Sequence, residues 1–238
     1  MKLGIIGAME EEVAQLKEQM SEVTVTKKAN LEFFDGYLSG TPVTVVRSGI
    51  GKVNAGCCTQ ILADLFSADC IINTGIAGSL DASIDIGDIV LCTDALQHDM
   101  DATAFGYELG VIPRMPVSAF PADKKLCELA EQLCRKVNPE ISVHTGRIVT
   151  GDQFIADHAK KEFLAAQFDG MCTEMEGAAI AQAAYNNGLP FLIIRAISDK
   201  ADNSAQMDYP TFEQQAITHT VRLMSALAGA VSESGQEN

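Results

Sequence analysis

The sequence contains no tryptophan, few aromatic residues of any kind and no long run of apolar residues. Aromatic residues make up 6% of the 238 positions, and no stretch approaches the roughly 18 apolar residues that cross a membrane as a helix. The first residues, MKLGIIGAMEEE, have an apolar part too short for a signal peptide, and acidic residues follow it directly. These absences predict a cytoplasmic protein with no membrane partner.

Positive charge is also scarce. Lysine and arginine number 17 against 32 acidic residues, which gives a formal net charge of -15. A surface of this sign repels nucleic acid, so no nucleic-acid partner is expected. The 47% content of hydrophobic residues indicates a globular protein, and the length suits one large α/β domain better than two. We therefore predict a single domain over residues 1–238.

The seven cysteines are odd in number, and the sequence has no CxxC motif. Most lie in apolar runs such as CIIN and VLCT, which indicates buried free thiols in a reducing compartment rather than disulfides or zinc ligands. No cluster of His, Cys and Asp has metal-ligand spacing, so neither a metal nor a cofactor is expected. The early GIIGAM departs from the dinucleotide-binding pattern G-x-G-x-x-G, and a tight turn explains its glycines better.

Short apolar strands alternate with helices along the chain. The strands are expected at residues 2–8, 23–26, 31–38, 41–48, 69–74, 88–93, 142–150 and 190–197. The helices are expected at residues 9–20, 51–66, 124–137, 158–167, 177–187 and 211–231. This order is typical of a three-layer α/β/α domain, in which helices cover both faces of a central, twisted, mixed sheet. The long segment 94–121 is expected to be a loop with a functional or interface role.

In such a sheet, ligands bind beyond the carboxyl ends of the strands. Polar or glycine-rich residues follow the expected strands in six stretches, at residues 7–12, 48–52, 74–78, 150–155, 173–177 and 198–202. Within the third stretch, residues 75–78 are expected to form a loop. The sequence therefore predicts a ligand site assembled from these six stretches.

Three of the stretches carry acids that suit catalysis or sugar binding. Glu12 lies at the edge of the apolar face of its helix and can face the site, whereas Glu11 points away. Glu176 lies where a strand gives way to a helix, and its two carboxylate oxygens suit a cis-diol. Asp199 follows a buried strand, and Asp202 competes for the same role. Each acid also has a plainer explanation, as a helix-dipole or capping residue.

Taken together, the motifs resemble one family. GIIGAMEEEV, SGIGKVNAG, INTGIAGSL, GDIV, HDMDATAFGYELG, TGDQFI, EMEGAAIAQ and RAISDKAD occur in this order and span almost the whole chain. They closely resemble the 5'-methylthioadenosine/S-adenosylhomocysteine nucleosidases of the nucleoside phosphorylase superfamily. EMEGAAIA and RAISD are shared across much of the superfamily, whereas GAMEEEV with TAFGYELG indicates the nucleosidase branch.

The resemblance implies hydrolysis of the N-glycosidic bond of both thio-nucleosides, and also of 5'-deoxyadenosine. Adenine and the 5-substituted ribose would be released, a step of methionine salvage and amino-acid biosynthesis. The resemblance further implies that Glu12 activates the attacking water and that Asp199 protonates purine N7. Asp199 must then carry a proton, which requires a raised pKa, whereas Glu12 must be ionised.

The resemblance also implies the substrate contacts and a homodimer. The contacts are Glu174, Met175, Glu176 and Arg195 near the ribose and water, Phe154 and Ile155 at adenine, Ser198 beside the acid, Met9, Ile50 and Tyr209 around the 5'-alkylthio group, and Ile76, Ala77 and Gly78 in the glycine-rich stretch. Phe105 and Pro113 would reach into the pocket of the neighbouring subunit. Ile76 stands where some members have serine, which removes one hydrogen bond near the water. Tyr209 stands where phenylalanine is common, and its hydroxyl needs a partner.

Three alternatives remain open at this stage. A phosphorylase of the same fold would need cations at the nucleophile, and Arg47 and Lys52 lie near the expected site, although three glutamates at the first helix oppose phosphate. A hydrolase of futalosine-type nucleosides is the second alternative. A catalytically silent nucleoside-binding protein is the third, but binding alone does not need a general acid.

Overall fold

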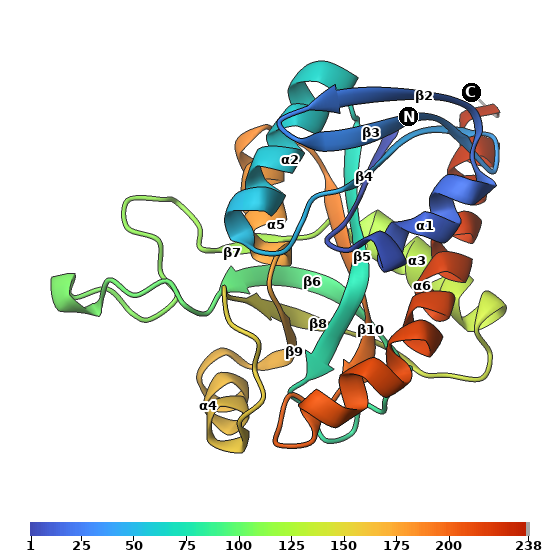
Figure 1. Cartoon of the computed structure of the whole chain (residues 1–238). Helices are drawn as coiled ribbons and strands as arrows, with labels where there is room; N and C mark the ends of the chain where they lie inside the picture. Colours follow the sequence, from blue (N-terminus) through green and yellow to red (C-terminus); the bar gives the residue numbers. More distant parts are fainter. Residues whose placement is uncertain (237–238) are drawn as a thin grey trace.

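The computed structural model describes residues 1–236, which form a central sheet with helices on both faces (Figure 1). The strands are β1 Leu3–Gly7, β2 Ser21–Lys28, β3 Leu31–Leu38, β4 Thr41–Arg47, β5 Cys70–Ser79, β6 Ile89–Gln97, β7 Ala119–Pro121, β8 Val143–Thr150, β9 Gly170–Glu174 and β10 Phe191–Asp199. The helices are α1 Glu10–Gln19, α2 Lys52–Phe66, α3 Lys124–Val137, α4 His158–Phe168, α5 Gly177–Asn186 and α6 Ala205–Gln236. The predicted fold class is confirmed. The single domain predicted over 1–238 ends two residues beyond the described part and stays a prediction.

Alternating side chains of the inner strands build two hydrophobic cores, one on each face of the sheet. Ile5 of β1 and Ile72 of β5 pack into the core under α1, α3 and α6, whereas their neighbours Ile6 and Ile71 pack into the core under α2 and α5. A strand turns successive side chains to opposite faces, so a strand that is apolar at every position must be covered on both. The continuous apolar runs of β1, β5 and β10 therefore specify the three layers.

The strand pairings close a circuit within the sheet. From its free edge the sheet runs β2, β3, β4, β1, β5, and β5 then pairs with both β9 and β10. These two strands connect through β8 and β6, so β5, β10, β6, β8 and β9 form a ring of paired strands. The pairs β5–β10, β6–β8 and β8–β9 are parallel, whereas β5–β9 and β6–β10 are antiparallel. The ring brings the carboxyl ends of β5, β9 and β10 together.

Two expected loops are partly strand. Residues 75–78 were expected to form a loop because of their glycines, but they continue β5, where each pairs with β10 and is buried. A strand buried on both faces needs no side-chain alternation, and glycine permits close approach of its neighbours. Residues 94–97 continue β6, and residues 94–96 pair with residues 119–121 of β7, so the loop 94–121 is shorter than predicted.

Two further boundaries differ from the sequence-based expectation. Helix α6 begins six residues before the expected start at 211 and contains Pro210, although proline opposes a helix interior. Strand β10 continues through Ser198 and Asp199, so the acid expected just past the strand is its last residue. The short strand β9 was not among the expected ranges.

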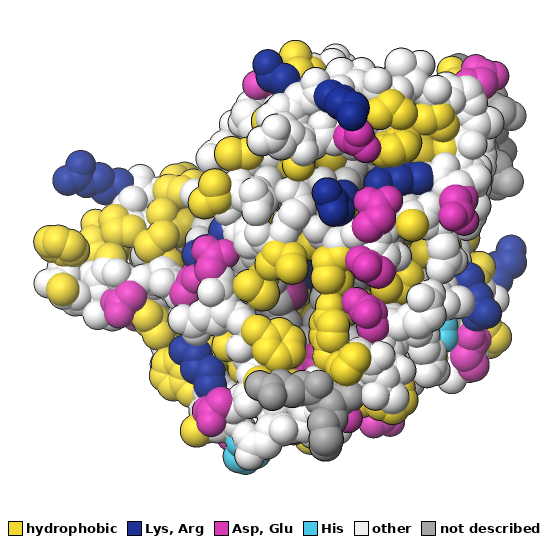
Figure 2. Space-filling model, viewed as in Figure 1, with side chains coloured by type: hydrophobic (Ala, Val, Ile, Leu, Met, Phe, Trp, Pro, Cys, Tyr) yellow, Lys and Arg dark blue, Asp and Glu magenta, His cyan; other side chains and the backbone are white. Residues whose placement is uncertain are grey.

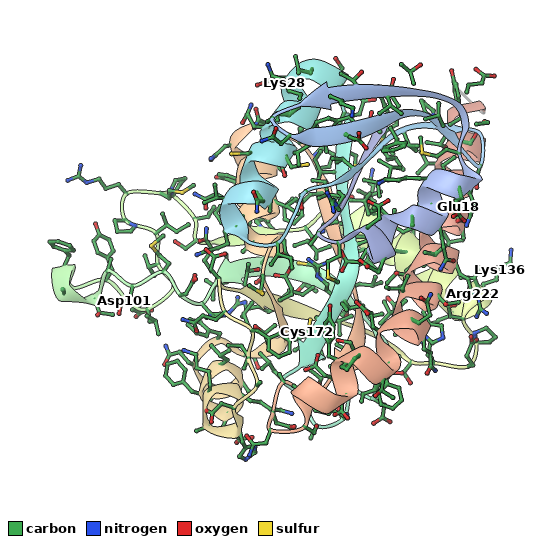
Figure 3. All side chains as sticks on the ribbon, in the orientation of Figure 1. Glu18, Lys28, Asp101, Lys136, Cys172 and Arg222 are labelled. Carbon is green, nitrogen blue, oxygen red and sulfur yellow. The ribbon has the colours of Figure 1, made fainter. Side chains whose placement is uncertain are left out.

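One segment leaves the body of the protein. The chain between β6 and β7 extends sideways as an arm, defined here as residues 98–118, with one short 3-10 turn at Thr103–Phe105 (Figure 1). Figure 3 labels Asp101 on this arm. Hydrophobic side chains gather on the arm in the space-filling view (Figure 2), and Phe105 is 85% exposed. An apolar side chain this exposed is typical of an interaction surface.

The remaining composition-based expectations concern cysteines, metals and membranes. All seven cysteines are unpaired, and six are buried, as predicted, whereas Cys57 is exposed. Cys172 of β9, labelled in Figure 3, is fully buried in the core under α2 and α5. Within residues 1–236 no group of three His, Cys, Asp or Glu side chains is arranged to hold a metal. No helix of this part is long and apolar enough to span a membrane.

The two-sided burial of β5 predicts a large effect of truncating its centre. Replacing Ile72, which is fully buried, by alanine should lower the free energy of unfolding by about 2–5 kcal/mol, because a cavity remains in a packed core. Leu65→Ala is the control, since Leu65 is 57% exposed and its truncation should cost no more than about 0.5 kcal/mol. Urea unfolding measures both, and equal losses would contradict the layered core.

Candidate active site

A cavity of about 490 Å³ opens where the carboxyl ends of β5, β9 and β10 meet the start of α1. The structure places the following sequence-predicted residues in its wall: Met9, Glu12, Ile50, Ile76, Ala77, Gly78, Phe154, Ile155, Glu174, Met175, Glu176, Ser198, Asp199 and Tyr209. Four more residues line it: Ala8, Gln153 and Thr173 lie in the predicted stretches but were not singled out, and Pro210 lies outside them. Each of these four directly adjoins a residue that was predicted, and that adjacency was the available signal.

Glu12 is buried at the amino-terminal end of α1, and its two oxygens have different surroundings. Oε2 accepts hydrogen bonds from the backbone N–H groups of Ala8 and Met9, at 2.6 and 3.0 Å, and Oε1 accepts one from Ile76 at 3.2 Å. Burial raises the pKa of Glu12 above its usual value, although Arg195 and the three N–H groups oppose the shift. The side chain is therefore fixed, and Oε1 carries one long hydrogen bond.

Glu174 and Arg195 form a buried ion pair behind the cavity wall. Arg195 is fully buried in β10 and donates through Nη2 to Glu174 and, at 2.5 Å, to Asn73 Oδ1. Glu174 also accepts from the backbone of Gly177 at 2.7 Å, which caps the start of α5, and from the Thr150 hydroxyl. Arg195 is not part of the cavity wall, so it acts through the carboxyl groups beside it.

Glu176 points into the cavity from the residue before α5. Its Oε1 accepts the backbone N–H of Gly51 at 2.8 Å, and its Oε2 lies 3.9 Å from Arg195 Nη2. Burial and the neighbouring Glu174 raise the pKa of Glu176 to about 7, against the lowering effect of Arg195 and of the Gly51 hydrogen bond. Among the described residues no donor lies within hydrogen-bonding distance of Oε2, which can therefore accept a hydrogen bond from a ligand.

Asp199, at the end of β10, lines the same cavity as Glu12. Its Oδ2 accepts the Ser198 hydroxyl at 2.9 Å and its Oδ1 accepts the backbone N–H of Ala201 at 2.8 Å. Burial raises the pKa of Asp199, and these two hydrogen bonds do not cancel the effect. The direction of the shift is the one that a proton donor requires.

The glycines of β5 let these acids approach the strand. A Cβ added to Gly75 would lie 2.5 Å from Glu12 Oε1 and would also overlap Arg195, and one added to Gly78 would lie 2.7 Å from Asp199 Oδ1. Such contacts do not occur in folded proteins. The expected loop character of TGIAGS was wrong, but its glycines have a structural role, since they make room for charged groups.

The outer part of the cavity is apolar. Phe154 and Tyr209 meet edge to face, with ring centroids 6.0 Å apart, and Phe154 is half exposed. The Tyr209 hydroxyl was expected to need a hydrogen-bond partner. It donates to Glu213 Oε1 at 3.1 Å and lies 3.2 Å from Met9 Sδ. Ile50, on the loop before α2, is also half exposed.

Several charged residues that the sequence offered as alternative phosphate ligands or proton donors lie outside the cavity. Arg47 lies 4.0 Å from Glu10, and Lys52 pairs with Asp99 at 2.5 Å; neither lines the cavity. Asp202 does not line it either, and its Oδ1 accepts from the backbone and hydroxyl of Ser204. Phe105 and Pro113 are on the arm and likewise lie outside the cavity of their own chain.

Comparisons with known proteins agree with this geometry. A sequence profile of the Phosphorylase superfamily matches residues 2–229. A 5'-methylthioadenosine/S-adenosylhomocysteine nucleosidase of an Exiguobacterium species is 43% identical over 228 residues, which cover 95% of this chain and 97% of that protein. The chain belongs to this nucleosidase family of the phosphorylase superfamily. The family resemblance found in the motifs is thereby confirmed.

Solved structures of the nucleosidase family have the same fold. That of the Neisseria meningitidis enzyme in complex with methylthio-immucillin-A is 36% identical, has a TM-score of 0.92 and is matched over 96% of this chain and 99% of its own. The futalosine hydrolase of Helicobacter pylori is 30% identical with a TM-score of 0.91, over 96% of this chain and 97% of its own. The fold alone therefore does not distinguish these two hydrolases.

The raised pKa of Glu176 predicts how a neutral substitution changes stability with pH. The native state holds this proton more tightly than the unfolded state, so the cost of ionising Glu176 is absent below about pH 4.5 and complete above about pH 7. Glu176→Gln keeps an acceptor for Gly51 but cannot ionise. Its stability relative to wild type should therefore rise between pH 5 and pH 8.

Urea midpoints at four pH values across this range test the prediction. Glu18→Gln is the control, because Glu18 is exposed on α1 (Figure 3) and its substitution should give a difference that stays flat. A difference for Glu176→Gln that falls with pH would show that the native carboxyl group is easier to ionise than an ordinary one.

Proposed function

We propose that the protein hydrolyses the N-glycosidic bond of 5'-methylthioadenosine and S-adenosylhomocysteine, releasing adenine and the 5-substituted ribose. One observation carries the proposal: Glu12 and Asp199 are both buried and line one cavity from different elements, and burial raises the pKa of Asp199 in the direction that a proton donor requires. The names of the relatives and the bound methylthio-immucillin-A of the Neisseria enzyme support it. The proposal includes 5'-deoxyadenosine as a further substrate, because it differs from 5'-methylthioadenosine only at the apolar 5' end.

The chemistry needs an acid on one side of the bond and a base on the other. As the bond breaks, positive charge develops on the sugar and negative charge on the purine, as in glycoside hydrolysis. In the proposal Asp199, whose pKa is raised by burial, donates a proton to purine N7 and neutralises the leaving group. Glu12 takes a proton from the attacking water through Oε1, which carries the single long hydrogen bond. Ser198 holds Asp199 through its hydroxyl.

The remaining cavity residues would bind the three parts of the substrate. Glu176 accepts hydrogen bonds from the ribose hydroxyls, while Arg195 and Glu174 support it from behind. Phe154 stacks on adenine, and the backbone of Ile155 reads its edge. In the proposal Met175, Ile76, Ala77 and Gly78 contact the sugar side, and Met9, Ile50 and Tyr209 surround the 5'-alkylthio group.

Water is the better supported nucleophile. A phosphate dianion requires cations and N–H donors directed at it, but Arg47 and Lys52 are paired with acids outside the cavity. The Arg195 guanidinium is occupied by Glu174. The acids around the cavity would repel phosphate and polarise water. Futalosine-type nucleosides remain the second candidate substrates, because the Helicobacter pylori futalosine hydrolase has this fold.

We also propose that the protein is a single-domain, cytoplasmic homodimer. The arm supports the dimer, since Phe105 is 85% exposed and neither Phe105 nor Pro113 contributes to the cavity of its own chain. In the proposal both reach the cavity of the second copy. Seven unpaired cysteines support a reducing compartment. The reaction as proposed needs no cofactor or metal.

Adenine release in phosphate-free buffer tests the reaction. The purified protein should release adenine and 5-methylthioribose from 5'-methylthioadenosine without phosphate, because water is the nucleophile. Asp199→Asn should lower kcat by about 10²–10⁴, the usual contribution of one proton-transfer group. Asp202→Asn is the matched control and should stay close to wild type, because Asp202 lies outside the cavity.

Two outcomes would overturn the proposal. Release that begins only when phosphate is added would make the protein a phosphorylase and remove the role given to Glu12. Full turnover by Asp199→Asn would mean that Asp199 is not the proton donor. Competition between 5'-methylthioadenosine and a futalosine-type nucleoside in the same assay ranks the two substrate classes.

A further inference from the structure

Three segments that follow the carboxyl ends of β4, β6 and β8 are joined by a closed set of hydrogen bonds between Lys52, Asp99 and Asp152. The Lys52 backbone N–H donates to Asp152 Oδ1 at 2.9 Å, and the Asp152 backbone N–H donates to Asp99 Oδ2 at 2.9 Å. Lys52 Nζ completes the set by donating to Asp99 Oδ1 at 2.5 Å. The side chains of Lys52 and Asp99 are each only 18% exposed. We call these three residues the clamp.

The local packing brings the clamp together. Strands β6 and β8 run parallel with Gln97 opposite Thr150, so Asp99 and Asp152 follow their strands at the same level. The His98 N–H donates to Thr150 O at 2.8 Å, and the His98 ring lies so close to Gly151 that an added Cβ would overlap it. Glycine at 151 therefore lets the two segments touch. Their next residues, Asp99 and Asp152, are held within hydrogen-bonding distance as a result.

The clamp also starts helix α2. The residue before the helix is Gly51, with φ at +96°, and a glycine has no side chain to cap the first N–H groups. Asp152 Oδ1 takes that part by accepting from Lys52 N. A Cβ on Gly51 would approach the same oxygen at 3.1 Å. Gly51 is thereby held in the orientation in which its own N–H donates to Glu176 Oε1.

We infer that Lys52, Asp99 and Asp152 are positioning residues that hold the Gly51 N–H against Glu176 and so fix Glu176 for ribose binding. This inference rests on the proposed function, because it assumes that Glu176 accepts the ribose hydroxyls. The clamp touches neither substrate nor reacting atoms. It also adjoins Ile50 and the loop that carries Phe154, and it lies at the base of the arm, so it connects the dimer arm with the cavity.

The inference gives Lys52 a function that is not phosphate binding. A lysine near the carboxyl ends of the strands left a phosphorylase open from the sequence. Lys52 Nζ instead donates to Asp99 and, at 3.1 Å, to Gln97 Oε1. Both acceptors lie at the end of β6 or just beyond it, and the cation is neutralised there. Removing one partner of a largely buried ion pair destabilises the structure around it, because the other charge is then left unpaired.

The test compares variants of the full-length protein on two substrates. Asp99→Asn keeps the shape of the side chain but removes its charge, and Lys52→Met removes the cation from the opposite side. The substrates are 5'-methylthioadenosine and its analogue without the 2'- and 3'-hydroxyls. The matched control is Asp94→Asn, because Asp94 lies in β6, the strand that Asp99 follows, and forms a partly buried pair with Arg147 at 2.6 Å, but takes no part in the clamp.

Asp99→Asn should lower kcat/KM for 5'-methylthioadenosine on the order of 10-fold, mainly through KM, which is the size expected for weakening one charge-assisted hydrogen bond. On the analogue the loss should shrink to less than about 2-fold, because the contact that the clamp supports is missing there. Lys52→Met should behave alike, and Lys52→Arg should recover most of the loss, since a cation still reaches Asp99. Asp94→Asn should show no difference between the two substrates.

Each other outcome contradicts the inference. An equal loss on both substrates would mean that the clamp stabilises the fold without positioning Glu176, and unchanged kinetics would mean that it does neither. If Asp99→Asn does not fold, the pair Lys52→Met and Lys52→Arg gives the same comparison. If the wild type itself releases no adenine, the proposed function fails; if the wild type is active and the variants lose nothing, the clamp alone fails.

Discussion

The buried guanidinium of Arg195 is the interaction on which the site depends. It lies behind the cavity wall, pairs with Glu174, and lies 3.9 Å from Glu176. It also lowers the pKa of Glu12, against the raising effect of burial. Carboxylates are costly to bury without a partner, and one cation among three carboxyl groups compensates only part of that cost. Burial therefore leaves the pKa of Glu12 and that of Glu176 raised, and the neighbouring Glu174 adds to the shift of Glu176.

The backbone makes this charge arrangement possible. The ring of strands brings β5, β9 and β10 to one point, and the glycines of β5 leave the volume that Glu12, Arg195 and Asp199 occupy. Acids are then anchored mainly by backbone N–H groups, from Ala8 and Met9 for Glu12 and from Ala201 for Asp199. Anchoring by backbone fixes each carboxyl group more firmly than flexible side chains would. The same backbone that forms the sheet therefore also positions the acids of the cavity.

The layers were predictable because apolar strands such as β1 and β10 must be covered on both faces, and that follows from composition alone. The motifs likewise located the cavity wall, because ligand sites form at the carboxyl ends of strands. The ring of strands was not predictable, since it depends on the short strand β9 and on the pairing of distant segments. Glycines at 75–78 suggested a loop, although only their three-dimensional neighbours explain them. Local patterns likewise gave no sign that Asp152 caps a helix 100 positions earlier.

The distribution of charge decides between water and phosphate more firmly than the family likeness does. Fold similarity extends to enzymes with different substrates, so it leaves the nucleophile open. The cations near the cavity are Arg195, Lys52 and Arg47, and each has an acid beside it: Glu174, Asp99 and Glu10 in turn. A phosphate dianion entering here would have to displace one of these partners or face the buried acids unaided. A neutral water has no such cost and gains a fixed acceptor in Glu12. In the proposed reaction, the pairs that keep Arg195 and Lys52 from phosphate also position Glu176, so nucleophile choice and site geometry depend on the same ion pairs.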